Sequence, residues 1–238
     1  MRRAGFVHDP NRGRGGDCLI AAALCSGLLL WPADATSGQC SARQPLQNAL
    51  KVYKAPQAGG TPMHITSARD APTWKTIEVG SFPDSTALRN ALDAADCAIG
   101  GQAEEVLARP AFTVVSRKME IDLVAVSPAE LGLDGDGVSL AAIYVRAWQL
   151  GFRPVPAEVG PQLRLQYPDQ PVGEFLIVGM EPIQTWSGEP VILTLANGGA
   201  GLILIGQCGR ASTKVALTSR FLFVRSQEFD DAQTTAHR

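Results

Sequence analysis

Polar and charged side chains crowd the segment from Pro154 to Ile183, among prolines, glycines and residues that favour β-strands. Burying such groups without partners costs about 2 kcal/mol or more each, so they must be solvated or bonded to one another or to a ligand. The segment therefore holds either a polar network that fixes the fold or a binding site. The residues concerned are Glu158, Gln162, Arg164, Gln166, Asp169, Gln170, Glu174 and Glu181.

Residues 162–167 alternate polar and apolar side chains, a pattern that predicts a β-strand. In a strand, Gln162, Arg164 and Gln166 would project from one face. That row could present donors and acceptors to a carbohydrate or a peptide. Arg164 could form a bidentate pair with Glu158, with Glu174 or with a ligand carboxylate. Internal pairing of Arg164 would instead make the row structural.

Three functions remain open for this block. The first is binding of a small molecule, a glycan or a protein partner. The second is a hydrolase acting on a glycan, with Glu158 and either Glu174 or Glu181 as acid and base, about 5–10 Å apart across a cleft. The third is a purely structural envelope protein. The ligand-binding candidates are Glu158, Gln162, Arg164, Gln166, Asp169, Glu174, Glu181 and the loop tryptophan Trp186.

Histidine is missing from the predicted core, because His8, His64 and His237 all lie outside it. Ser-His-Asp and Cys-His nucleophile systems, histidine-ligated zinc and a histidine general base therefore lack their central residue. Residues 134–137 resemble the start of a calcium loop without its later ligands, and predict a tight turn instead. We expect neither a metal nor a cofactor.

The amino terminus has the features of a secretory signal peptide. Basic residues precede an apolar run from Cys18 to Trp31, which is shorter than the roughly 20 residues that span a bilayer. Ala33-Asp34-Ala35 forms a small-residue cleavage site. We therefore expect residues 1–35 to be removed, the mature protein to be secreted or periplasmic, and no stable membrane span to remain.

The charge of the chain argues against nucleic acid as a partner, and its cysteines limit the possible disulfides. The chain has 21 Lys and Arg against 23 Asp and Glu, without the concentrated basic face that nucleic-acid binding needs. Removal of the leader leaves Cys40, Cys97 and Cys208, and an oxidising compartment permits one disulfide. We favour Cys97–Cys208, and three unpaired thiols are the alternative.

Element patterns predict a single α+β domain over residues 73–225, after a flexible linker over 36–72 and before a disordered tail over 226–238. Helices are expected near 85–95, 103–108 and 139–150, and strands at 74–79 and 121–126. Strands at 162–167, 174–180, 191–196, 202–208 and 220–224 follow, with a hairpin signal at Asn197-Gly198. Helices that precede a mainly antiparallel sheet of C-terminal strands define the expected fold class.

The chain also resembles a family of uncharacterised bacterial proteins. The resemblance runs from Trp74 to about Val224, and its most specific part is PAEVGPQLRLQYPDQPVGE at 156–174, followed by MEPI at 180–183. Shorter matching pieces are WKTIEVG, ALRNAL, PAF, IDLV, ELG and I-x-x-RA-x-x-LG. Family members often carry cysteine where this chain has Val155. The resemblance implies the domain limits and the order of elements, and no activity or substrate.

The leader gives a direct prediction. We expect the exported protein to begin at Thr36, because the preceding A-x-A sequence is a signal-peptidase site. Intact-mass spectrometry of exported protein measures the terminus. A soluble pool that retains Met1 would contradict export and the oxidising compartment.

Overall fold

The fold is that of a computed structural model, which describes residues 64–198 and 201–226. These residues belong to one compact unit of the chain, Ser37–Arg238. The predicted leader lies outside the described residues, as do the linker up to residue 63 and the tail after Ser226.

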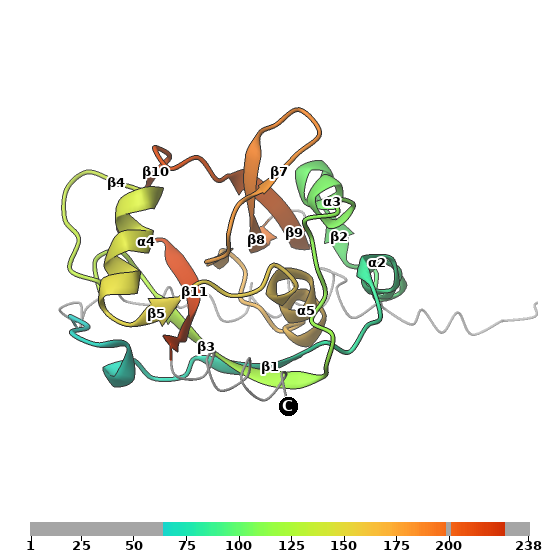
Figure 1. The fold of residues 1–238 in the computed structure, drawn as a ribbon, viewed down its shortest axis with the longest axis horizontal. Coiled ribbons are helices and arrows are strands. Elements are labelled where there is room, and N and C mark those ends of the chain that lie inside the picture. Colours follow the sequence, from blue (N-terminus) through green and yellow to red (C-terminus); the bar gives the residue numbers. More distant parts are fainter. Residues whose placement is uncertain (1–63, 199–200, 227–238) are drawn as a thin grey trace, which may run out of the picture. The chain divides into compact units, whose positions relative to one another are not determined.

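A curled, mixed sheet dominates this unit (Figure 1). Its strand order is β1-β3-β11-β6-β8-β9-β2, with β5 paired to β11 and β7 paired to β8, while β4 and β10 form a separate pair. The β11–β6 and β2–β9 pairs are parallel, and the other pairs are antiparallel. The strands are β1 (Lys75–Val79), β2 (Ala98–Ile99), β3 (Met119–Val126), β4 (Val138–Ser139), β5 (Phe152–Arg153), β6 (Phe175–Val178), β7 (Ile183–Gln184), β8 (Pro190–Gly198), β9 (Gly201–Cys208), β10 (Lys214–Val215) and β11 (Arg220–Arg225).

Four α-helices and one short 3-10 helix are distributed along the described chain between the strands. The expected order, with helices first and an antiparallel sheet after them, is therefore wrong, because β1, β2 and β3 precede the last two helices and the sheet is mixed. The helices are η1 (Ala68–Asp70), α2 (Ser85–Ala94), α3 (Gly101–Leu107), α4 (Leu140–Gln149) and α5 (Val159–Gln166).

Local sequence signals explain α2 and α4. The Asp84 carboxylate accepts a hydrogen bond from the N–H of Ala87 at 2.8 Å and so caps α2. The Ser139 hydroxyl caps α4 in the same way, and Gly151 follows that helix with a φ of +93°. The predicted starts of both helices are confirmed.

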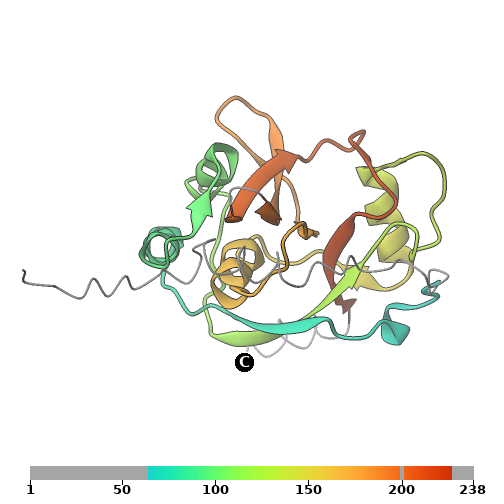
Figure 2. The ribbon, with the colours of Figure 1, turned by 180° about the vertical axis from the view of Figure 1, so that it is seen from behind.

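Helix α5 replaces a predicted strand. It contacts β1 near one end of the sheet, β8 and β9 near the other, and helix α2. Figures 1 and 2 show it inside the curl from opposite sides. A Cβ on Gly160 would lie 2.9 Å from Leu193 Cδ1, so glycine at this position allows α5 to approach β8 closely.

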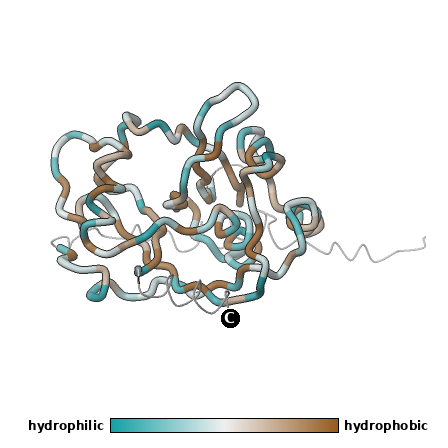
Figure 3. Tube along the Cα trace, in the orientation of Figure 1, coloured by the Kyte–Doolittle hydropathy of each residue, from teal (hydrophilic) through white to brown (hydrophobic). Residues whose placement is uncertain are grey.

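The core includes side chains from both faces of the central strands, because consecutive residues of β8 and of β11 are buried. Hydrophobic residues lie mainly on the strands and helices, and the loop between β7 and β8 is mostly hydrophilic (Figure 3). Phe221 and Phe223 stack with their centroids 6.0 Å apart, and Phe152 and Tyr144 pack against Phe223. No helix within the described ranges combines the length and apolar character that crossing a bilayer requires.

The packed part of the chain begins earlier than Thr73. Ile65, Ala68 and Ala71 are buried, and the N–H of Ile65 donates to the Glu130 carbonyl at 2.8 Å. Residues 64–72 of the predicted flexible linker thus form part of the folded unit. At the other end, the N–H of Ser226 donates to the Gly151 carbonyl at 3.0 Å.

This packing predicts a stability effect. We expect Ile65→Ala to lower the free energy of unfolding by about 2 kcal/mol, because it removes buried methyl groups from the start of the fold. The exposed neighbour Thr66 provides a matched control, and Thr66→Ala should change stability by less than about 0.5 kcal/mol. Urea denaturation followed by circular dichroism measures both. Equal midpoints for the two variants would show that this segment contributes no packing.

Candidate functional site

The most buried polar residue of the candidate block is Glu158, just before α5. Its side chain is 0% exposed. One carboxylate oxygen accepts from the N–H of Gly80 at 2.8 Å and from Gln162 Nε2 at 2.8 Å, and the other accepts from the N–H of Val115 at 2.7 Å. The carboxylate therefore has partners from three parts of the chain and no surface open to a ligand.

Gln166 satisfies the backbone of edge strand β1. Its amide oxygen accepts from the N–H of Glu78 at 2.9 Å, and its amide nitrogen donates to the carbonyl of the same residue at 2.8 Å. This reciprocal pair is the pattern that an adjacent strand would supply. Gln162 adds a hydrogen bond to the Ser81 hydroxyl at 2.9 Å. These glutamines attach α5 to the sheet edge and do not form a row on a strand.

Arg164 is fully buried and bonds to neutral oxygens. It donates to Gln170 Oε1 at 2.5 Å and to the Tyr167 carbonyl. No carboxylate of the described residues forms an ion pair with it, so the expected pairing with Glu158 or Glu174 is absent. Burial lowers the pKa of the Arg164 guanidinium to about 10. Its role is to hold the turn after α5.

Gln170 extends the same network into the sheet. Its amide nitrogen donates to the Glu174 carbonyl at 3.1 Å, and the Asn197 side chain donates to the Gln170 carbonyl at 2.6 Å. Burial raises the pKa of the Glu174 carboxyl, and the hydrogen bond from Tyr167 and the nearby charge of Arg220 act in the opposite direction. Asp169 is exposed beside this network. None of these residues lines the two pockets that lie beside α4 and β5.

The cysteines do not pair as expected. Cys208 is a free, exposed thiol, so the predicted Cys97–Cys208 disulfide is not formed. Cys97 is disulfide-bonded, but not to Cys208. The hydrogen bond from Thr213 lowers the pKa of the Cys208 thiol.

A groove with two pockets lies on another part of the surface, where α4, β5 and the loop after β6 meet. One pocket has a volume of about 480 Å³ and the other about 520 Å³, and both are lined by Arg153, Pro154 and Glu181. We call these adjoining cavities the two-pocket groove. Tyr144, Val145, Trp148, Phe152 and Phe223 contribute to the first pocket, and Thr113, Val155, Pro156, Pro182 and Ile183 to the second.

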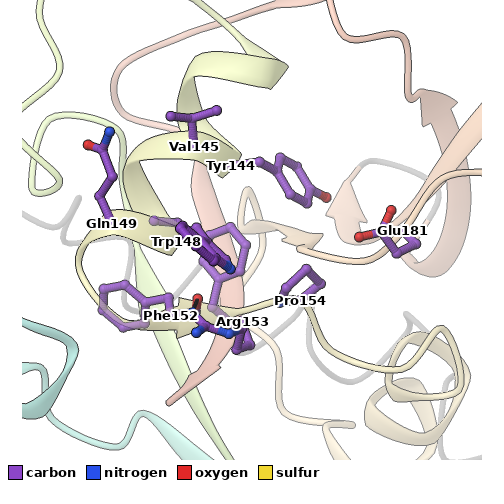
Figure 4. A pocket seen from close by; sticks show the side chains of 10 residues that line it. Tyr144, Val145, Trp148, Gln149, Phe152, Arg153, Pro154 and Glu181 are labelled. Carbon is purple, nitrogen blue, oxygen red and sulfur yellow. Dashed lines mark hydrogen bonds between the residues drawn. The ribbon is translucent and has the colours of Figure 1, made fainter. Parts of the chain in front are cut away.

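The first pocket has an aromatic wall. Trp148 is 62% exposed, and the Arg153 guanidinium lies 5.0 Å from the centroid of its ring. The Tyr144 hydroxyl donates to the Met180 carbonyl at 2.7 Å and is directed toward Glu181 (Figure 4). Burial raises the pKa of this phenol above its ordinary value, and the negative charge of Glu181 raises it further.

Of the predicted ligand-binding residues, Glu181 alone lines the two-pocket groove. Trp186 is 70% exposed in the loop between β7 and β8, with the Arg109 guanidinium 3.9 Å from its ring centroid. Sequence reasoning missed Tyr144, Trp148 and Arg153. A signal was present, because Ala141, Val145 and Trp148 have helical spacing on a face away from the buried Ile143 and Ala147.

Comparisons with family models, curated proteins and solved structures find no match for this chain. The described residues bring together no group of three or more His, Cys, Asp or Glu side chains that could hold a metal ion. The candidate site is therefore defined by its own geometry, a largely apolar groove with one cation and one anion at its middle.

The network around Glu158 gives a prediction for stability. We expect Glu158→Gln to lower the free energy of unfolding by about 3 kcal/mol, because the new amide NH2 would face a backbone N–H donor in a buried place. The exposed Asp169 offers the same chemical change nearby, and Asp169→Asn should cost less than about 0.5 kcal/mol. Chemical denaturation measures both, and an unchanged midpoint for Glu158→Gln would refute the structural role.

Proposed function

We propose that this protein is a binding module that holds an extended segment of a partner protein in the two-pocket groove. The observation that carries the proposal is the continuity of the two pockets through Arg153, Pro154 and Glu181. A partner chain lying across this junction can place one apolar side chain in each pocket. Its intervening backbone then passes over the charged residues between them.

The lining favours a peptide over a glycan. Grooves lined by aromatic residues are typical recognition surfaces for extended, proline-rich peptides. Few polar groups line the groove, and the Tyr144 hydroxyl already donates to the Met180 carbonyl. A sugar would need more partners for its hydroxyl groups than these side chains supply.

The arrangement of carboxylates does not support the hydrolase alternative. Two carboxylates on opposite sides of a cleft are needed for that chemistry. Both oxygens of Glu158 bond to backbone N–H groups, and Glu181 is the one acidic residue among the described side chains that line the two pockets. The exposed apolar pair Val145 and Trp148 on one face of α4 favours a binding surface over a purely structural role.

The location of the protein decides where it meets such a partner. The proposed location is the cell envelope or the space outside the cell, and it rests on the leader sequence alone. Partner binding in the groove does not depend on it.

Selection from a random dodecapeptide phage library on the purified protein tests the proposal. We expect enriched peptides that lose affinity about tenfold or more with Trp148→Ala, since exposed tryptophans at binding sites dominate affinity. Trp186→Ala, which removes another exposed tryptophan outside both pockets, should leave the affinity within about twofold. Isothermal titration calorimetry measures both variants. If no enriched peptide loses affinity with Trp148→Ala, the proposal is overturned.

A further inference from the structure

Two opposite charges lie at the junction of the two-pocket groove, and neither is neutralised. Arg153 and Glu181 line both pockets. The ion pairs of the described residues are Arg89–Glu104, Lys118–Glu78, Arg210–Glu189 and Arg220–Glu130, so neither groove charge belongs to one. Neither charge is therefore neutralised by an ion pair among the described residues.

Among residues 64–198 and 201–226, no group donates a hydrogen bond to the Glu181 carboxylate. The phenol of Tyr144 is directed toward Glu181 in Figure 4, and its proton is committed to the Met180 carbonyl at 2.7 Å. Pro154 and Pro182, which also line the second pocket with Glu181, have no backbone N–H to offer. The carboxylate therefore depends on water or on a bound partner for its hydrogen bonds.

Arg153 is held in place while most of its donors remain available. Its Nη1 donates to the Phe152 carbonyl at 2.9 Å, and the guanidinium lies over the Trp148 ring. An arginine guanidinium has five N–H donors, of which this contact uses one. The orientation is thus fixed before binding, and a carboxylate can be accepted without further ordering of the side chain.

An apolar occupant would cover both charges and remove their water. Desolvation of an unpaired charge opposes binding, and opposite charges on the partner offset that cost. An occupant that brings a cation to Glu181 and an anion to Arg153 is therefore favoured over an uncharged one.

We infer that the two-pocket groove selects partner segments that carry one basic and one acidic side chain, the basic one facing Glu181 and the acidic one facing Arg153. This inference rests on the proposed function and names the chemistry of its partner. The order of the two charges along the partner segment then provides specificity, because the reversed order places like charges opposite each other.

The test compares dodecapeptide selections on the wild-type protein and on the charge-reversed variant Arg153→Glu/Glu181→Arg. Wild-type selections should be enriched in peptides with a basic and an acidic residue close together. Exchanging those two residues in a synthetic peptide should weaken wild-type binding roughly tenfold, which corresponds to about 1.4 kcal/mol, and the charge-reversed variant should prefer the exchanged peptide. Fluorescence anisotropy measures the affinities, and the preference should shrink in high salt.

The matched control reverses an exposed ion pair elsewhere. Arg89→Glu/Glu104→Arg keeps the net charge and changes α2 and α3, away from the groove, so it should retain the wild-type preference. If the groove variant does not fold, Arg153→Gln and Glu181→Gln replace it. Each should make the wild-type peptide bind no better than a peptide with alanine at the position facing the neutralised residue.

The possible outcomes test this inference separately from the proposed binding function on which it rests. Peptides that need Trp148 but tolerate exchange of their charges would overturn the charge selection and leave the binding function standing. Enriched peptides that are indifferent to Trp148 would overturn both. A preference inverted by the charge-reversed variant alone supports the inference.

Discussion

A buried carboxylate joins three parts of this fold that are distant in sequence. Glu158 accepts hydrogen bonds from the end of β1, from the segment before β3 and from α5 itself. The desolvation of a buried charge is offset only when its lone pairs are satisfied, and three donors satisfy this one. Helix α5 can therefore occupy the inside of the curled sheet in one orientation, and Gln166 then completes the edge of β1.

The same constraint places the two-pocket groove. The segment from Phe152 to Glu158 runs from β5 directly into α5, so fixing α5 also fixes the prolines that line the groove. The N–H of Val155 donates to the Gly179 carbonyl at 2.8 Å, which joins this segment to the loop that carries Glu181. The polar block of the sequence thus acts mainly in the fold, and the proposed binding surface lies at its two ends.

The sequence predicted the elements with local signals and missed those determined by tertiary contacts. The caps of α2 and α4 and the β8–β9 hairpin follow from residues close in the chain. The pairing extends to Gly198 and Gly201, so Asn197 lies within β8 and not in the turn. Helix α5 was read as a strand because it is buried on nearly every side, and a short buried helix has no single polar face to reveal its period.

The candidate site was only partly accessible from sequence for a related reason. Glu158 and Arg164 were recognised as residues that needed partners, but most of those partners are backbone groups and a neutral amide, which carry no sequence signature. The expectation of carboxylate pairing for Arg164 was wrong for this reason. Trp148 follows the buried Ala147 in the chain, but helical spacing turns its side chain outward.

Native-state hydrogen exchange tests the role of Glu158 and Gln166 most directly. The amide hydrogens of Glu78, Gly80 and Val115 bond to side chains of this network. If the network holds the fold together, these three amides should exchange only through global unfolding, as slowly as the amides of Leu193 and Leu195 in the buried strand β8. Exchange of Gly80 and Val115 at the rate of open loop amides would contradict the account.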